Sequence, residues 1–130
     1  MFSHIMVGVT DFDRAMAFYK PVLDSLGIQR RFQEDERPRA GWQSSPDPRP
    51  LFIIGRPQNR QAHHPGNGQM VAFLAQSRDQ VRHVHALALA SGGTCEGQPG
   101  LRPEYHAHYY GAYFRDPDGN KLCVACHHAE

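Results

Sequence analysis

The chain has 130 residues, of which 40% are hydrophobic and 21% are charged, a composition typical of one soluble globular domain rather than of a disordered segment. Its 14 Lys and Arg residues are scattered among 13 Asp and Glu residues, so no basic stripe favours nucleic acid as a partner. No apolar run approaches the roughly 20 residues of a membrane helix, and none resembles a signal peptide, so we expect a cytoplasmic protein without a membrane partner.

The beginning of the chain predicts a strand followed directly by a helix. Residues 2–9 are rich in β-branched and apolar side chains, and residues 10–13 then resemble a helix capping box. Apolar residues recur at i, i+3, i+4 and i+7 as far as Leu26, and Gly27 follows at the usual position of a left-handed C-cap. The helix is therefore expected to bury one face and to end at Gly27.

Three short strands are expected after this helix, around residues 29–33, 40–44 and 51–54. The segments between them are rich in Pro, Asp and Arg, which confines them to loops. Residues 58–67 show no apolar periodicity and contain both Pro and Gly. We interpret them as a linker that follows a first module at residues 1–57.

The same order of elements recurs in the second half of the chain. Residues 70–75 predict a strand, residues 77–80 a capping box, and an apolar stripe at helical spacing then runs to Gly92. Three more strands are expected at 94–96, 108–114 and 121–125, with a type I turn at 116–119. A period of about 65 residues indicates an internal duplication, with a second module at 68–130 inside a single domain of residues 1–130.

Several segments follow a pattern known from one superfamily: residues 4–11, Phe18-Tyr19 followed by Leu23 and Leu26-Gly27, and above all Phe114-Arg-Asp-Pro-Asp-Gly-Asn120. They resemble the vicinal oxygen chelate superfamily of glyoxalases, bleomycin-resistance proteins and extradiol dioxygenases. The resemblance implies an α+β fold, in which two tandem βαβββ modules form an open curved sheet or half-barrel around a small-molecule cavity. It also implies a homodimer.

Metal-using members of that superfamily place a His in the first strand of each module and carboxylates in the last strand of a module, and the metal polarises two substrate oxygens. The resemblance gives His4 as the first ligand, but Met70 occupies the second His position and Cys123 the final carboxylate position. Residues 51–54 carry no donor side chain. Because divalent metals prefer imidazole and carboxylate ligands, we expect no cofactor, and a divalent metal at His4 is the alternative.

A small organic molecule is the expected ligand of the cavity between the modules. The residues predicted to bind it are Met6, Trp42, Phe52, Met70, His106, Tyr109 and Cys123. The residues predicted to be catalytic are His4, His108 and Tyr110. For Trp42, packing in the hydrophobic core is an equal alternative. For Phe52 and Met70, the alternative is an apolar cavity wall without a polar role.

A polar stretch rich in His and Tyr precedes the strand expected around residues 108–114. If this stretch is extended, His106, His108 and Tyr110 share one face. Tyr105 and Tyr109 then take the other face. The imidazoles are suited to act as a base or to hydrogen-bond a carbonyl, since His titrates near neutral pH. An exposed loop is the alternative interpretation.

The remaining histidines and cysteines have simpler interpretations. The His pair at 63–64 falls in the expected linker, and the pair at 127–128 falls in a C-terminal segment that we expect to be frayed. His83 and His85 lie beside the apolar stripe of the second helix, where we expect them to face solvent or the sheet edge. The three cysteines are an odd number, which favours reduced thiols.

The sequence therefore supports a leading hypothesis and three rivals. The leading hypothesis is a glyoxalase, bleomycin-resistance and dioxygenase-like protein that binds a small organic molecule and lacks the usual metal ligands. The first rival is a metal-dependent lyase or dioxygenase with a non-standard site that retains His4. The others are an antibiotic-sequestering binder of the bleomycin-resistance type and a partner-binding module with a vestigial pocket.

Overall fold

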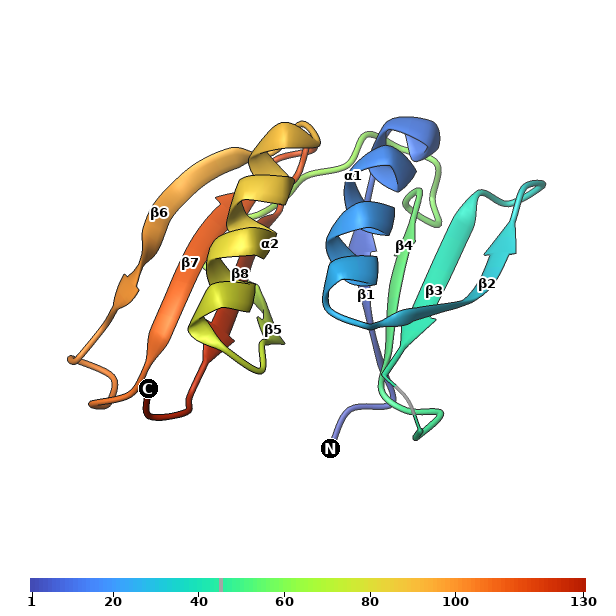
Figure 1. Cartoon of the computed structure of the whole chain (residues 1–130). Helices are drawn as coiled ribbons and strands as arrows, with labels where there is room; N and C mark the ends of the chain where they lie inside the picture. Colours follow the sequence, from blue (N-terminus) through green and yellow to red (C-terminus); the bar gives the residue numbers. More distant parts are fainter. Residues whose placement is uncertain (45) are drawn as a thin grey trace. The chain divides into compact units, whose positions relative to one another are not determined.

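Each half of the chain folds as a strand, a helix and three further strands (Figure 1). The computed structural model describes residues 1–44 and 46–130, which divide into two units, residues 1–65 and residues 66–130. Each unit contains one open four-stranded sheet with one helix. The predicted α+β fold of two tandem βαβββ modules is thus confirmed.

In the first unit, the helix packs on one face of the sheet. Its elements are β1 (His4–Gly8), α1 (Phe12–Ser25), β2 (Gln29–Glu34), β3 (Arg39–Gln43) and β4 (Leu51–Gly55). The strand order is β1-β4-β3-β2, with β1 parallel to β4 and the other pairs antiparallel. The core of the unit lies between this sheet and α1, where Phe18, Tyr19 and Leu23 are fully buried.

The ends of α1 lie where the sequence predicts them. Asp11 is the N-cap residue, and its carboxylate accepts a hydrogen bond from the Arg14 N–H at 3.0 Å. Gly27 has a φ of 72°, which glycine adopts without steric cost, and the Ile28 N–H behind it donates to the Leu23 carbonyl at 3.0 Å. The helix is therefore terminated by the predicted left-handed glycine.

The second unit repeats this arrangement. Its elements are β5 (Val71–Leu74), α2 (Arg78–Ala90), β6 (Thr94–Leu101), β7 (Tyr110–Arg115) and β8 (Lys121–Cys126), and the strand order is β5-β8-β7-β6. Ser77 caps α2 by accepting from the Gln80 N–H at 3.1 Å, as the capping-box pattern predicts. Helix α2 covers one face of this sheet (Figure 1).

Strand β6 is longer than the sequence predicts. It extends over eight residues, although Gly97, Pro99 and Gly100 are typical of turns. The pairing with β7 shifts register between Cys95 and Gly97 and again between Gly97 and Gly100. Because β6 is an edge strand, bulges and a proline are tolerated there, and the strand continues past residues that would interrupt a central one.

The turn between β7 and β8 is closed by its first residue. Asp116 is buried, and its Oδ1 accepts hydrogen bonds from the N–H groups of Asp118 and Asn120, both at 2.9 Å. The Asn120 side chain donates to Oδ2 of the same carboxylate at 2.8 Å. Gly119 has a φ of 89°, which completes the turn. The Asp-Pro-Asp-Gly-Asn segment thus fixes how β7 and β8 pair.

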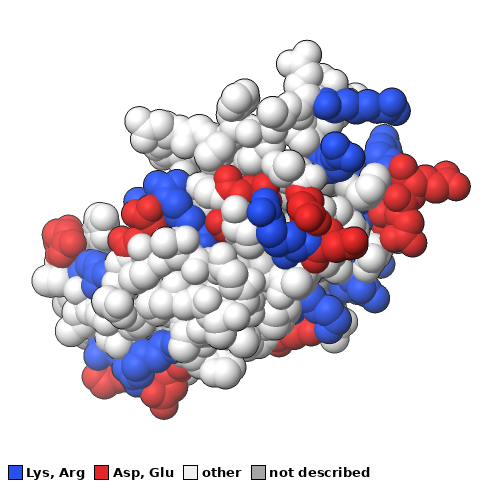
Figure 2. Space-filling model, turned by 90° about the horizontal axis from the view of Figure 1, so that it is seen from above, with Lys and Arg blue, Asp and Glu red and all other residues white. Residues whose placement is uncertain are grey.

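Charge is mixed on the surface that Figure 2 shows, where basic side chains lie among acidic ones with uncharged areas between them. No large area of a single sign covers this face. Within residues 1–44 and 46–130, neither helix has the length and hydropathy that crossing a bilayer requires.

His85 is buried in the second unit, so it does not face solvent, and of the two expected positions it takes the one toward the sheet edge, at strand β6. It is 4% exposed, its ring contacts Phe114 at 6.3 Å between centroids, and its Nε2 lies 3.3 Å from the Cys95 Sγ. The helix places residue 85 one position after the buried Val84, on the margin of the apolar stripe, and the sheet covers that margin. Burial lowers the pKa of His85 below its ordinary value of 6.5.

This buried histidine predicts a pH-dependent stability. Because the unfolded chain binds a proton at His85 more readily than the folded chain, the free energy of unfolding should fall as the pH drops below about 6.5. Between pH 7.5 and pH 5.5, urea unfolding should show a smaller loss of stability for His85→Leu than for the unaltered chain. The exposed His83 offers the control, since His83→Leu should leave the pH dependence unchanged. Equal pH dependence in all three proteins would contradict the prediction.

Candidate ligand-binding site

The two faces of the second sheet differ in what covers them. In the pairing of β7 with β8, Phe114 lies opposite Leu122, and both are fully buried on the face toward α2. Tyr113 precedes Phe114, and Cys123 follows Leu122. These two residues lie opposite each other, so their side chains point to the other face. This other face carries no helix of its own unit, and it is where side chains of the second unit form a pocket.

The pocket has a volume of about 680 Å³ and is open to solvent on one side. Its wall comprises residues 66–70, the loop side chains of Tyr105, His106 and Tyr109, the strand side chains of Tyr113, Arg115 and Lys121, and His127. All of these residues belong to the second unit. Aromatic rings, imidazoles and basic groups therefore dominate the wall.

The aromatic part of the wall comes from the loop between β6 and β7. The Tyr105 N–H donates to the Arg102 carbonyl at 3.0 Å, which makes a first turn. A second turn follows, in which the Tyr109 N–H donates to the His106 carbonyl at 3.2 Å. The alternation expected of an extended stretch does not apply to turns, so Tyr105, His106 and Tyr109 all line the same pocket.

Two tyrosines of the pocket wall form a hydrogen-bonded group with Cys123, which was predicted to bind the ligand but is fully buried and not part of the wall. The Tyr109 hydroxyl is 3.0 Å from the Tyr113 hydroxyl and 3.5 Å from the Cys123 Sγ. Burial raises the pKa of Tyr109, Tyr113 and Cys123 above their ordinary values, and for Tyr109 the hydrogen bond to Cys123 raises it further. All three groups are therefore protonated at neutral pH, and they offer neutral hydrogen bonds rather than a thiolate nucleophile.

Two imidazoles form the side of the pocket next to Tyr109. The His106 Nε2 lies 2.8 Å from the His127 Nδ1, and the rings stack with centroids 5.1 Å apart. The Tyr109 ring meets both of them edge-on, at 5.7 Å from His106 and 5.3 Å from His127. A hydrogen bond between two imidazoles needs one nitrogen as donor and the other as acceptor, so at least one ring is neutral.

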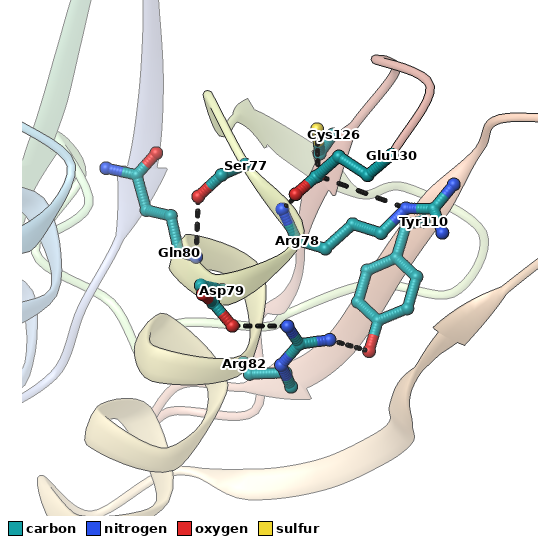
Figure 3. Close-up of polar contacts among 8 residues, drawn as sticks. All are labelled: Ser77, Arg78, Asp79, Gln80, Arg82, Tyr110, Cys126 and Glu130. Atoms are coloured by element: carbon teal, nitrogen blue, oxygen red, sulfur yellow. Dashed lines mark hydrogen bonds and ion pairs between the residues drawn. The ribbon is translucent and has the colours of Figure 1, made fainter.

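His127 is a site residue that the sequence interpretation missed, and the expected fraying of the C-terminal segment is wrong. The Glu130 carboxylate accepts a hydrogen bond from the Arg78 N–H at 2.7 Å, in the first turn of α2, and lies 4.0 Å from the Arg78 Nε (Figure 3). An anion at a helix N-terminus is favourable because it satisfies free N–H groups. This contact fixes the last residues of the chain and thereby His127.

Tyr110 and His108, both predicted to be catalytic, lie away from the pocket. The ring of Tyr110 faces α2, with the Arg78 and Arg82 guanidinium groups 5.3 and 5.4 Å from its centroid (Figure 3). Its hydroxyl accepts a hydrogen bond from Arg82 at 2.9 Å, and Arg82 also pairs with Asp79. His108 is exposed, and its N–H donates to the His106 Nδ1 at 3.2 Å.

The four predicted residues of the first unit fall on two faces of its sheet. Trp42 lies opposite Phe52 in the β3–β4 pairing, their centroids are 6.4 Å apart, and the Phe52 ring lies 5.4 Å from Tyr19 on α1. Both are buried, so they belong to the core of the unit and not to an open surface. His4 and Met6 are exposed on the opposite face of β1.

The chain matches the Glyoxalase/Bleomycin resistance protein/Dioxygenase superfamily over residues 1–124. It belongs to this superfamily. A glyoxalase/bleomycin resistance protein from Albidiferax ferrireducens T118 is 41% identical, with a TM-score of 0.85, over 96% of this chain and 98% of that one. No protein with a curated description matches the sequence.

Two other superfamily structures share the fold at low sequence identity. A glyoxalase-related enzyme from Fulvimarina pelagi has 19% identity and a TM-score of 0.72, over 97% of this chain and 87% of that one. An enzyme of the glyoxalase/bleomycin resistance protein/dioxygenase family from Burkholderia phytofirmans PsJN has 17% identity and a TM-score of 0.69, over 97% and 98%. These two show a shared fold, whereas the family match over residues 1–124 confirms the predicted superfamily.

The donor set that the superfamily resemblance implies does not fit a hard divalent metal. In the described part of the chain, no group of three or more His, Cys, Asp or Glu side chains is placed to hold a metal ion. Burial keeps the Cys123 thiol protonated, and Met70 contributes a thioether to the pocket wall. The neighbour of His4 on β4 is Leu51, which carries no donor. A thiol and a thioether are poor replacements for the carboxylate and imidazole that Mg or Mn prefer.

The anchoring of His127 leads to a prediction about Glu130. Glu130→Ala should release the C-terminal segment, destabilise the chain by about 1 kcal/mol through loss of the carboxylate at the start of α2, and separate His127 from His106. Hydrogen exchange at the His127 amide and a urea unfolding curve measure the two effects. Glu36→Ala, an exposed carboxylate of the first unit, is the control. Unchanged exchange at His127 would argue against this role.

Proposed function

We propose that this chain binds a small organic molecule in the pocket of its second unit, and that its own side chains hold the ligand without a resident metal ion. The observation that supports this most is the make-up of the wall, in which flat rings surround neutral hydrogen-bonding groups. A volume of about 680 Å³ lies within the range of sites for small ligands.

Different side chains of the wall are suited to contact different parts of a ligand. The rings of Tyr105 and Tyr109 offer apolar surface for stacking. Below them, the hydroxyls of Tyr109 and Tyr113 can each donate or accept a hydrogen bond, and the paired imidazoles of His106 and His127 can do the same. Such a wall selects a ligand that is planar on one side and polar on the other.

Binding without a metal ion is the part of the proposal that separates this chain from a metal-dependent lyase or dioxygenase. The Cys123 thiol and the Met70 thioether support it, because they replace the carboxylate and imidazole that Mg or Mn prefer. A sequestering role of the bleomycin-resistance type, a homodimer and a cytoplasmic location stay predictions from the resemblance and the composition.

Two adjacent tyrosines provide a matched test of the pocket. A thermal-stability screen of aromatic aldehydes, catechols and aromatic antibiotics should yield compounds that raise the melting temperature, because a ligand at 100 times its Kd stabilises the native state by about 2.7 kcal/mol. Tyr109→Phe removes the hydroxyl that bonds Tyr113 and Cys123 and should weaken binding about five- to tenfold. Tyr110→Phe, on the face toward α2, should leave the affinity unchanged. Equal effects of the two substitutions, or no stabilising compound at all, would contradict the proposed pocket.

Metal removal tests the second part of the proposal. After treatment with a chelator and gel filtration, the affinity for any compound found in the screen should stay within about twofold of its starting value, since no metal contributes to binding. His4→Ala should have no effect either. A loss of affinity on chelation that Mn²⁺, Ni²⁺ or Zn²⁺ restores, and that the His4→Ala protein reproduces, would favour a metal-dependent enzyme instead.

A further inference from the structure

The Lys and Arg side chains of the pocket wall give it a positive charge. Arg115 and Lys121 contribute to its wall, and among the residues that the structure describes no Asp or Glu side chain does so. A third cation, Arg102, lies beside the same wall, with its guanidinium 5.5 Å from the centroid of the Tyr113 ring. The Lys121 ammonium lies 5.7 Å from that centroid. Two positive groups thus lie at the Tyr113 ring, and Arg115 adds a third to the same pocket wall.

Only one of these three cations is paired with a carboxylate in the described part of the chain. Arg115 forms an ion pair with Glu96 and donates to the Gly119 carbonyl at 2.7 Å. The hydrogen bond from Arg115 is the main reason why the pKa of Glu96 is lowered, and the more distant Lys121 adds a smaller effect. Glu96 is therefore ionised and already engaged, which leaves an excess of positive charge at this side of the pocket.

Arg102 and Lys121 are available to a ligand. The Arg102 guanidinium donates to the backbone carbonyls of Gln98 at 2.8 Å and Leu101 at 3.3 Å, neither of which carries a charge. Lys121 forms no ion pair within the described part of the chain, and its ammonium lies over the face of Tyr113 at the distance of a cation–π contact. Both cations also act to lower the pKa of Cys123, against the larger effect of burial, so their field extends to the thiol that contacts Tyr109.

The rest of the wall is suited to a planar ring. Tyr105 is 63% exposed and meets Tyr109 edge-on with centroids 4.9 Å apart, so a face of its ring is open to stacking. The stacked imidazoles of His106 and His127 continue this aromatic surface on the far side of Tyr109. Aromatic pairs prefer offset or edge-to-face contacts, and this cluster offers both to an entering ring.

We infer that the ligand is a small aromatic carboxylate, whose carboxylate group is held by Lys121 and Arg102 beside Tyr113 and whose ring packs against Tyr105 and Tyr109. This inference rests on the proposed function, because it names the class of molecule that the same pocket takes. Cations beside a partly desolvated pocket favour an anion through charge-assisted hydrogen bonds. A neutral molecule of the same shape can stack on the same rings, but it lacks the charge-assisted hydrogen bonds and should bind more weakly.

The test uses a pair of probes that differ in charge and not in shape, 2-naphthoate and 2-naphthamide, titrated into the ¹⁵N-labelled full chain. Naphthoate should bind about tenfold more tightly, shift the amide signals of residues 102–109 and 121–123, and weaken as salt is added. Lys121→Met and Arg102→Met keep much of the apolar stem and should each reduce the preference for naphthoate several-fold. Lys121→Arg should retain most of it.

Controls separate this inference from the proposed function. Lys20→Met removes an exposed lysine of α1 and should leave both affinities unchanged. A melting temperature close to that of the unaltered chain shows that each variant is folded. If both probes bind equally and Tyr109→Phe weakens the binding of both, the proposed function is supported and the inference of an anionic ligand is overturned. If neither probe shifts any signal of the pocket, both the inference and the proposed function fail. If inorganic phosphate binds as tightly as naphthoate, the inference that the ligand carries an aromatic ring is overturned.

Discussion

The pairing of β7 with β8 is the constraint on which the candidate site depends. Because side chains alternate along a strand, the register that sets Phe114 opposite Leu122 also sets Tyr113 opposite Cys123 on the other face. A slip of one residue would exchange the two faces, exposing the core and burying the tyrosine. The Asp116 carboxylate holds this register through hydrogen bonds across the turn. The turn residues 116–120 thus act on the pocket through the sheet, without being part of the pocket wall.

Much of the fold follows from local patterns that a sequence displays openly. The caps at Asp11 and Ser77, the left-handed Gly27 and the turn at residues 116–119 are each determined by a few neighbouring residues. The order of strand, capped helix and glycine recurs after about 65 residues, and this repetition predicts two modules. The length of β6 was not predictable in this way, because edge strands tolerate glycine and proline that a local pattern assigns to turns.

The site was harder to predict because contacts distant in sequence determine it. His127 reaches the pocket through a contact between Glu130 and Arg78, 52 residues apart, which no local pattern reveals. The stretch that contains His106 and Tyr109 folds into turns, so the strand alternation that would have separated them does not hold. Met70, His106 and Tyr109 line one pocket, although the strand alternation predicts His106 and Tyr109 on opposite faces. The same alternation groups His106 with His108 and Tyr110, which are not part of the pocket wall.

The identity of residue 123 connects the two proposals. The resemblance places a metal-binding carboxylate at this position in metal-using members, and here a buried, protonated thiol takes its place beneath Tyr109. A carboxylate at this buried position would need a cation to offset the cost of burying its charge, which a metal ion supplies. It would also repel an anionic ligand. A neutral thiol removes both effects at once, so the same change that disfavours a metal ion leaves the field of Arg102 and Lys121 free to act on a carboxylate from outside.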